Sequence, residues 1–287
     1  MSGNVLFCFG LGYSAGFLAR ALAAKGWRIA GTTRDQPKGG EEFPLHRFSR
    51  EHPLGDAAQL PADATHVLIS IPPDAAGCPV LAALGAELSA RKNLAWLGYL
   101  STTNVYGDRG GAWVDEASPT NPSGERGRRR VAAEAGWLDL WRKAGAPAHI
   151  FRLAGIYGPG RNALEALKAG TARRVAKPGQ AFSRIEVEDL VAVLLASMAR
   201  PRPGGVYNVC DDEAAPPDAV VAYAASLLGV APPPLEDFAT VPLSPMARSF
   251  YDDNKRVSNR LIKEELGVTL RYPTYREGLT ALNRAAT

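Results

Sequence analysis

The chain has 287 residues, 46% of them hydrophobic and 22% charged, a composition typical of a soluble globular protein of about two domains. The net charge of +4 is too small to indicate nucleic acid, and no run of about 20 apolar residues indicates a membrane span. Only three scattered cysteines occur, and the first residues lack a signal-peptide pattern, so we expect a cytoplasmic protein.

Strand and helix patterns alternate over the first half of the chain. Residues 5–9 form a short apolar run, and the helical spacing of Phe17, Leu18, Ala21 and Leu22 predicts a helix that ends near Gly26. Strands separated by helices favour βαβ units, and therefore a Rossmann-type, doubly wound parallel sheet of the α/β class. The further predicted strands are residues 28–33, 66–71, 94–100, 148–153 and 206–209.

The pattern changes after residue 210. A helical stretch over residues 219–228 precedes a run of three prolines, and a charged helix is predicted over residues 254–266. We therefore expect an NAD(P)-binding Rossmann domain over residues 1–210, with an inserted piece of the substrate lobe near 160–182. Residues 211–287 are expected to form a small C-terminal lobe that closes over a substrate cleft.

A glycine-rich turn lies between the first predicted strand and the first predicted helix. Its sequence, Gly-Leu-Gly-Tyr-Ser-Ala, fits G-x-G-x-x-A, in which the first glycine permits the turn and the second lets the backbone approach a pyrophosphate. The start of the helix adds N–H groups and a positive dipole end. The alternative is a turn that binds nothing. We predict a dinucleotide site that includes Gly10, Gly12, Tyr13, Ser14 and Ala15.

The end of the second predicted strand bears on the choice of cofactor. NAD sites usually carry an acidic residue there for the ribose 2′-hydroxyl, whereas Arg34 comes first in this chain and Asp35 follows. An arginine suits a 2′-phosphate, which favours NADP(H); NAD remains the alternative if Asp35 faces the ribose. Ligands bind at the carboxyl ends of strands in open α/β sheets, where we expect Ser70, Ile71, Pro72 and Ser101.

Later segments contain a series of ordered motifs. Ser101–Gly107 is similar to S-[ST]-x-x-V-Y-G, Asp115–Pro122 to D-E-x-x-P-x-x-P, and Arg152–Arg161 to R-x-x-x-I-Y-G-P-G. Phe182–Leu190 and Asn254–Asn259 are similar to I-N-x-I-H-V-x-D-L and to S-x-K-x-x-x. In these motifs the chain resembles the extended and atypical short-chain dehydrogenase/reductases, which are related to the NAD-dependent epimerases and dehydratases. The resemblance covers nearly the whole chain.

This resemblance implies chemistry by a Ser or Thr, a Tyr that transfers a proton, and a Lys that lowers the pKa of that Tyr, while hydride moves at the nicotinamide. Thr102 holds the Ser/Thr place. Arg126 and Arg130 stand where the Tyr and the Lys belong, and a guanidinium does not release a proton as a phenol does. Arg130 retains a positive charge, and Tyr157 lies in the loop expected over cofactor and substrate. The catalytic candidates are therefore Thr102, Tyr157 and Arg130.

Three accounts of the activity stay open. Another group supplies the proton, the reaction needs only hydride transfer and electrostatic stabilisation, or the protein is a non-catalytic NADP(H)-responsive module. We favour an oxidoreductase or epimerase-like enzyme acting on a small, anionic or sugar-nucleotide substrate. Arg161 is a candidate contact for an anionic group, and so are the arginines at the predicted helix start, for which simple solvation is the equal alternative: Arg126, Arg128, Arg129 and Arg130. The family resemblance allows a homodimer, and no metal, nucleic-acid or membrane site is expected. The alternative proton donors are Tyr106, Tyr157, Asp115, Glu116 and Glu125.

Overall fold

The computed structural model of the chain describes residues 3–54 and 60–285. It comprises two compact units, each assembled from three stretches of sequence. The sheet unit contains residues 1–102, 128–152 and 191–207, and the lobe unit contains residues 103–127, 153–190 and 208–287. The domain boundary expected near residue 210 stays a prediction, but residues 103–127 and 153–190 group with the C-terminal residues.

A seven-stranded parallel sheet confirms the predicted Rossmann-type fold. Its strand order is β11-β7-β5-β4-β1-β2-β3, so that the chain winds outward in both directions from the first strand. The strands are β1 (Val5–Phe9), β2 (Arg28–Thr33), β3 (Leu45–Arg47), β4 (His66–Ile69), β5 (Trp96–Thr102), β7 (Ala148–Leu153) and β11 (Val206–Val209).

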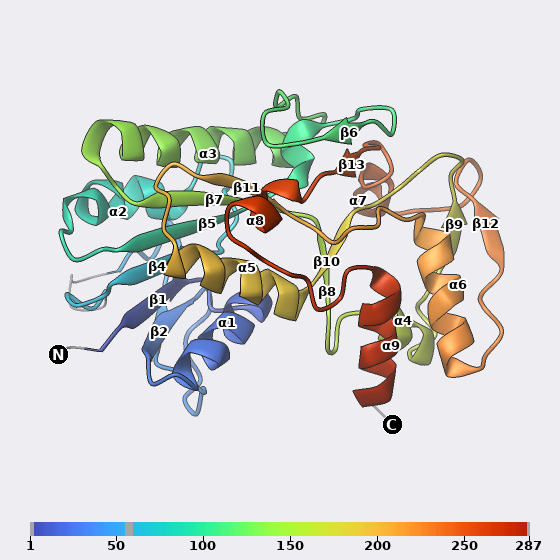
Figure 1. Cartoon of the computed structure of the whole chain (residues 1–287), viewed down its shortest axis with the longest axis horizontal. Coiled ribbons are helices and arrows are strands. Elements are labelled where there is room, and N and C mark those ends of the chain that lie inside the picture. Colours follow the sequence, from blue (N-terminus) through green and yellow to red (C-terminus); the bar gives the residue numbers. More distant parts are fainter. Residues whose placement is uncertain (1–2, 55–59, 286–287) are drawn as a thin grey trace. The chain divides into compact units, whose positions relative to one another are not determined.

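Helices cover both faces of this sheet. Figure 1 shows α2 (Pro79–Ala90) and α3 (Glu125–Ala144) on one side, and α1 (Tyr13–Ala23) and α5 (Val187–Ala199) on the other. Strands covered on both faces need apolar side chains at every position, because successive side chains point to opposite faces. β1, with five buried residues in a row, meets this requirement.

Aromatic side chains fill the core of the sheet unit. On the side of α2 and α3, Phe7 and Tyr99 pack in one cluster with Trp137 of α3. On the other face, the indole of Trp96 donates a hydrogen bond of 3.0 Å to the hydroxyl of Ser197 in α5. These buried contacts hold the strands and the helices that cover them in fixed positions.

The lobe unit consists of short elements. Three parallel two-stranded pairs join β6 (Trp113–Val114) to β13 (Arg256–Val257), β8 (Gly155–Tyr157) to β10 (Arg184–Glu186), and β9 (Arg174–Ala176) to β12 (Leu235–Asp237). The helical elements are the 3₁₀ turn η2 (Thr103–Tyr106), α4 (Ala163–Lys168), α6 (Pro217–Leu228), α7 (Pro245–Ser249), α8 (Arg260–Glu264) and α9 (Tyr275–Ala285).

The helix predicted over residues 254–266 is wrong in its first half. Arg256 and Val257 form β13 instead, and α8 begins only at Arg260. The backbone of Arg256 bonds to Ala112 and the side chain of Asn259 bonds to the carbonyl of Cys210, contacts that replace a first helical turn. Tertiary pairing has overridden local helical preference here.

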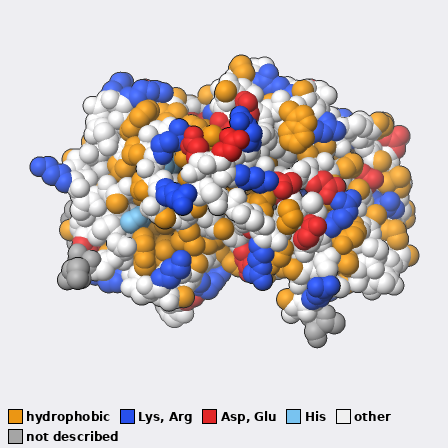
Figure 2. Space-filling view, viewed as in Figure 1, with side chains coloured by type: hydrophobic (Ala, Val, Ile, Leu, Met, Phe, Trp, Pro, Cys, Tyr) orange, Lys and Arg blue, Asp and Glu red, His pale blue; other side chains and the backbone are white. Residues whose placement is uncertain are grey.

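Two further features concern the surface and the helices. Basic and acidic side chains are interspersed over the face shown in Figure 2, as expected from a net charge of +4. Among the described residues, no helix is both long enough and apolar enough to span a bilayer.

Candidate functional site

The turn after β1 is fixed from both neighbouring strands. The N–H of Gly10 donates to the hydroxyl of Thr32 in β2 (2.9 Å), and the hydroxyl of Ser70, after β4, donates to the carbonyl of Gly10 (2.5 Å). Gly10 has a φ of +84°, and a Cβ there would lie 2.9 Å from Cγ1 of Ile71. Glycine is therefore required at this position by its backbone conformation and by the space around it.

The start of α1 has the features of an anion-binding helix N-terminus. Gly12 is the N-cap residue, so no side chain caps the helix, and no acidic residue lies in the first turn. The first amides of a helix lack intrahelical acceptors. A Cβ built on Gly12 would meet nothing within 4 Å, which leaves open space directly before these amides. The cradle fits a pyrophosphate, the group that dinucleotide-binding turns hold.

A groove of ≈ 740 Å³ in the sheet unit extends from this turn along the ends of four strands. Of the predicted cofactor residues, Gly10, Gly12, Arg34, Ser70, Ile71 and Pro72 all line it. Tyr13 lines a smaller neighbouring cavity with Gly12, while Ala15 lies on the buried face of α1. The lining is completed by residues 32–35 after β2, residues 47–52 after β3, and Pro73, Asp74 and Pro79.

Two arginines lie where the groove passes β2 and β3. Arg34 follows Thr33, and Thr33 is the register partner of Arg47 at the end of β3. Both side chains are exposed, and neither forms an ion pair with a described residue. Arg47 could not be recognised as a groove residue from the sequence, because β3 has only three residues and no recognisable strand pattern.

A third arginine of the groove, Arg50, forms an ion pair with Asp74. Its Nε and Nη2 atoms donate to the two carboxylate oxygens of Asp74 at 2.8 and 2.9 Å, and Nη2 also donates to the carbonyl of Gly77 at 3.1 Å. The Arg50 hydrogen bonds hold the pKa of Asp74 below its usual range, with help from the N–H of Ala76.

Ser101 does not line the groove, contrary to expectation. It is buried at the end of β5, where its hydroxyl donates to Oε1 of Glu134 at 2.5 Å. Oε2 of the same carboxylate accepts hydrogen bonds from Nη2 and Nε of Arg152 at 2.8 and 3.1 Å. Glu134 is 3% exposed and Arg152 is 7% exposed. Ser101 thus belongs to a buried ion-pair network that links β5, α3 and β7.

Arg130 is anchored on β5. Its Nη1 donates to the carbonyl of Leu100, and its guanidinium lies 5.7 Å from the ring centre of Tyr99. Burial raises the pKa of the Tyr99 phenol. Thr102 ends β5 and is partly exposed. The catalytic roles of Thr102 and Arg130 stay predictions.

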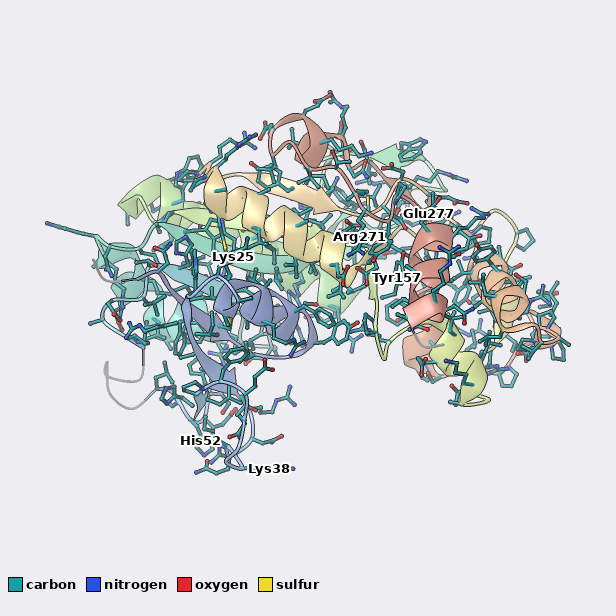
Figure 3. The ribbon with its side chains drawn as sticks, turned by 60° about the horizontal axis from the view of Figure 1, so that its bottom comes forward. Lys25, Lys38, His52, Tyr157, Arg271 and Glu277 are labelled. Atoms are coloured by element: carbon teal, nitrogen blue, oxygen red, sulfur yellow. The ribbon has the colours of Figure 1, made fainter. Side chains whose placement is uncertain are left out.

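Tyr157 belongs to a core cluster of the lobe unit. Figure 3 shows it beside α9, and a Cβ at Gly278 of that helix would lie 2.1 Å from the Tyr157 hydroxyl. The buried hydroxyl has no hydrogen-bond partner among the described residues, and burial raises its pKa. Its predicted catalytic role stays a prediction, and these surroundings favour packing instead.

Most of the alternative proton donors are held in structural contacts. The hydroxyl of Tyr106 donates to Asn208 (2.7 Å), whose N–H in turn donates to Glu116 (2.7 Å). Asp115 accepts hydrogen bonds from Ser118, which lower the pKa of its carboxyl group.

Glu125 has a different setting at the start of α3. Together with Arg126 it lines a cavity of ≈ 270 Å³ in the lobe unit. The other lining residues are Asn104, Ser123, Gly124, Gly127, Ser249, Phe250, Asp252 and Asp253.

Two buried carboxyl groups in the lobe unit escaped the sequence reasoning. Burial raises the pKa of Glu186 to about 7 and that of Asp211 to about 8. Arg184 donates to the carbonyls of Phe182 and Ala215. Oδ2 of Asp211 is buried and has no hydrogen-bond partner among the described residues. Asp211 begins an acidic run that resembles an exposed turn in the sequence.

Within residues 3–54 and 60–285, no group of three or more His, Cys, Asp or Glu side chains is arranged to hold a metal ion. All three cysteines are buried and free. The groove of the sheet unit combines the uncapped start of α1, the open space at Gly12 and the exposed side chains of Arg34 and Arg47, and it is our candidate ligand-binding site.

Known proteins support this assignment of fold and family. Residues 86–210 match the NAD dependent epimerase/dehydratase family. The chain is 28% identical to protein YeeZ of Escherichia coli K12 over 281 residues, which cover 92% of this chain and 94% of that protein.

Solved structures extend the comparison to the whole chain. A functionally unknown conserved protein from Silicibacter pomeroyi DSS is 54% identical, with a TM-score of 0.89 and 99% of both chains covered. The dTDP-glucose 4,6-dehydratase of Bacillus anthracis, solved in complex with NAD, is 16% identical, with a TM-score of 0.79 over 99% of this chain and 96% of that one. The chain thus belongs to one family with the Silicibacter pomeroyi protein, and its resemblance to the short-chain dehydrogenase/reductases of the NAD-dependent epimerase/dehydratase type is confirmed.

Proposed function

We propose that the groove of the sheet unit binds NADP(H), and that the protein is an oxidoreductase or epimerase-like enzyme acting on a small anionic molecule. The observation that carries the proposal is the combination of an uncapped helix start, an open space at Gly12 and, along the same groove, two arginines that form no ion pair with a described residue. The bound cofactor would supply hydride transfer at its nicotinamide.

Different residues of the groove would bind different groups of the cofactor. The first-turn amides of α1 would hold the pyrophosphate, and Arg34 and Arg47 would hold the 2′-phosphate. A hydrogen bond to a charged group contributes about 1.5–3 kcal/mol, or roughly ten- to a hundredfold in affinity. Asp35, the acidic residue that would favour NAD, is a single carboxylate against two guanidinium groups. This balance supports NADP(H) over NAD.

The proposed substrate contacts lie in the lobe-unit cavity of ≈ 270 Å³ that Glu125 and Arg126 line. Arg126 is a permanent cation at the place where the family has its proton-donating Tyr, so we assign it to an anionic group of the substrate. Glu125 lines the same cavity and can exchange protons, which makes it our candidate for general acid–base catalysis. Thr102 and Arg130 are proposed to act at the reacting end of the cofactor.

A second candidate function is a non-catalytic NADP(H)-responsive protein. Arg126 favours it, because no guanidinium can replace the phenol in proton transfer. The two functions differ in one observable: an enzyme transfers hydride from labelled NADPH to a carbonyl substrate, whereas a responsive module binds NADPH and changes its affinity for a partner without turnover.

The cofactor proposal is tested by titrating NADPH and NADH into wild type, Arg34→Ala and Arg47→Ala by calorimetry. Each substitution should weaken NADPH binding about ten- to a hundredfold and leave NADH binding unchanged, because only NADPH carries the 2′-phosphate. Arg28→Ala is the matched control, since Arg28 is an exposed arginine of β2 outside the groove. An unchanged preference for NADPH in both variants would show that the 2′-phosphate binds elsewhere.

A further inference from the structure

Arg50 presents a flat guanidinium group that is held in place before any ligand binds. The fork formed by its Nε and Nη2 atoms matches the two oxygens of Asp74, and the carbonyl of Gly77 accepts a further bond from Nη2. The carboxylate is itself held by the N–H of Ala76 at 2.8 Å. A bidentate pair of this kind fixes the plane of the guanidinium as well as its position.

The pair joins segments that the sheet keeps apart. In the order β4-β1-β2-β3, the strands before Asp74 and Arg50 are separated by β1 and β2. The loop after β3 approaches the loop after β4 by packing across β1, where the Phe48 ring lies 5.3 Å from that of Phe9. Arg50 and Asp74 thereby form part of the groove wall beside the β1 turn and the end of β2.

The charge of this wall differs from that at Arg34 and Arg47. Asp74 compensates the positive charge of Arg50, so the pair suits a neutral group better than a phosphate. Arg50 is nevertheless one-third exposed, and its Nη1 atom donates to no described residue. A planar cation with a free face is a platform for an aromatic ring.

We propose that Arg50 is the stacking platform for the adenine ring of the cofactor. The inference rests on the proposed function: the base is attached to the ribose whose 2′-phosphate is assigned to Arg34 and Arg47, and Arg50 belongs to the adjoining wall. Phe48, the only aromatic ring among the described lining residues apart from His52, is buried in the core at 2% exposure. His52 lies farther along the loop and is exposed (Figure 3).

Calorimetric titration of Arg50→Ala with NADPH and with NADH tests the proposal. Because both cofactors carry adenine, the dissociation constants of both should rise by the same factor, about tenfold, which is within the range for loss of a base-stacking side chain. Arg50→Tyr provides a flat face without the guanidinium and should bind both cofactors within about threefold of wild type. Arg28→Ala, which removes an exposed arginine of β2 outside the groove, is the control and should bind like wild type. His52→Ala removes the other flat side chain of this wall and tests whether that ring, rather than Arg50, holds the base.

Each other outcome has a distinct meaning. The proposal is overturned by unchanged binding in Arg50→Ala, by a loss confined to NADPH, by a loss in Arg50→Tyr equal to that in Arg50→Ala, or by a loss in His52→Ala instead. The third result would show that the ion pair with Asp74, rather than the flat face, supports the site. If wild type binds neither cofactor, the proposed function fails as well; if it binds NADPH and Arg50→Ala binds it equally, only this inference fails.

Discussion

Replacing Gly12 by alanine should separate binding from folding. Gly12 has a φ of −94°, which alanine adopts without strain, and its Cβ would meet no atom within 4 Å. The loss of folding free energy should therefore be limited to the weaker N-cap preference of alanine, about 1 kcal/mol or less. The new methyl group would, however, occupy the space assigned to the pyrophosphate. Displacing one or two charge-assisted hydrogen bonds of about 1.5 kcal/mol or more each predicts at least a tenfold weaker affinity for NADPH.

The assay combines NADPH titration with urea unfolding, and Gly10→Ala is the comparison variant. At Gly10 the φ of +84° and the close approach of Ile71 predict a folding penalty of about 1–3 kcal/mol. Gly12→Ala should thus lose affinity at nearly unchanged stability, while Gly10→Ala should lose stability. Wild-type affinity in Gly12→Ala would refute the reasoning, because it would mean that no phosphate approaches this backbone.

Two further predictions concern buried charges. Arg152→Met should lower the unfolding free energy by about 3–5 kcal/mol in urea titrations, because it leaves the Glu134 carboxylate buried without its guanidinium partner. The double variant with Glu134→Leu should recover part of this loss. A loss below about 1 kcal/mol in the single variant would contradict the buried pair. The second prediction concerns Glu186 and Asp211, whose pKa values are raised in the folded protein to about 7 and about 8. The folded protein therefore retains protons that the unfolded protein releases, so the free energy of unfolding falls as the pH rises from about 4 to about 8. Asp211→Asn should reduce this fall by about 2 kcal/mol or more between about pH 5 and about pH 8, and an unchanged slope would exclude Asp211 as its source.

The turn after β1 was the most predictable part of the groove. The turn from Gly10 to Ala15, the strand before it and the helix after it are determined by residues close in sequence. Local spacing therefore carried the necessary information, and Arg34, one strand later, was reached by the known geometry of a βαβ unit.

Contacts between distant residues escaped the same reasoning. Arg47 lies on a strand of three residues that exists only because it pairs with β2. Ser101 looked like a residue of the crevice, but Glu134 and Arg152 come from two other elements to engage it. Tyr157 lies in a core cluster beside Gly278, which is far along the chain, and local sequence could not show this contact; its catalytic role stays a prediction. In each case the side chain's role depends on which element folds against it.

The interleaved course of the chain restricts how the protein can be dissected. The polypeptide passes from one unit to the other after residues 102, 127, 152, 190 and 207. A truncation at residue 210 would remove most of the lobe unit while leaving behind its segments 103–127 and 153–190, stripped of the helices that bury Tyr157 and Leu164. Point substitutions, rather than deletion fragments, are consequently the means by which the groove of the sheet unit and the lobe-unit cavity lined by Glu125 and Arg126 can be studied separately.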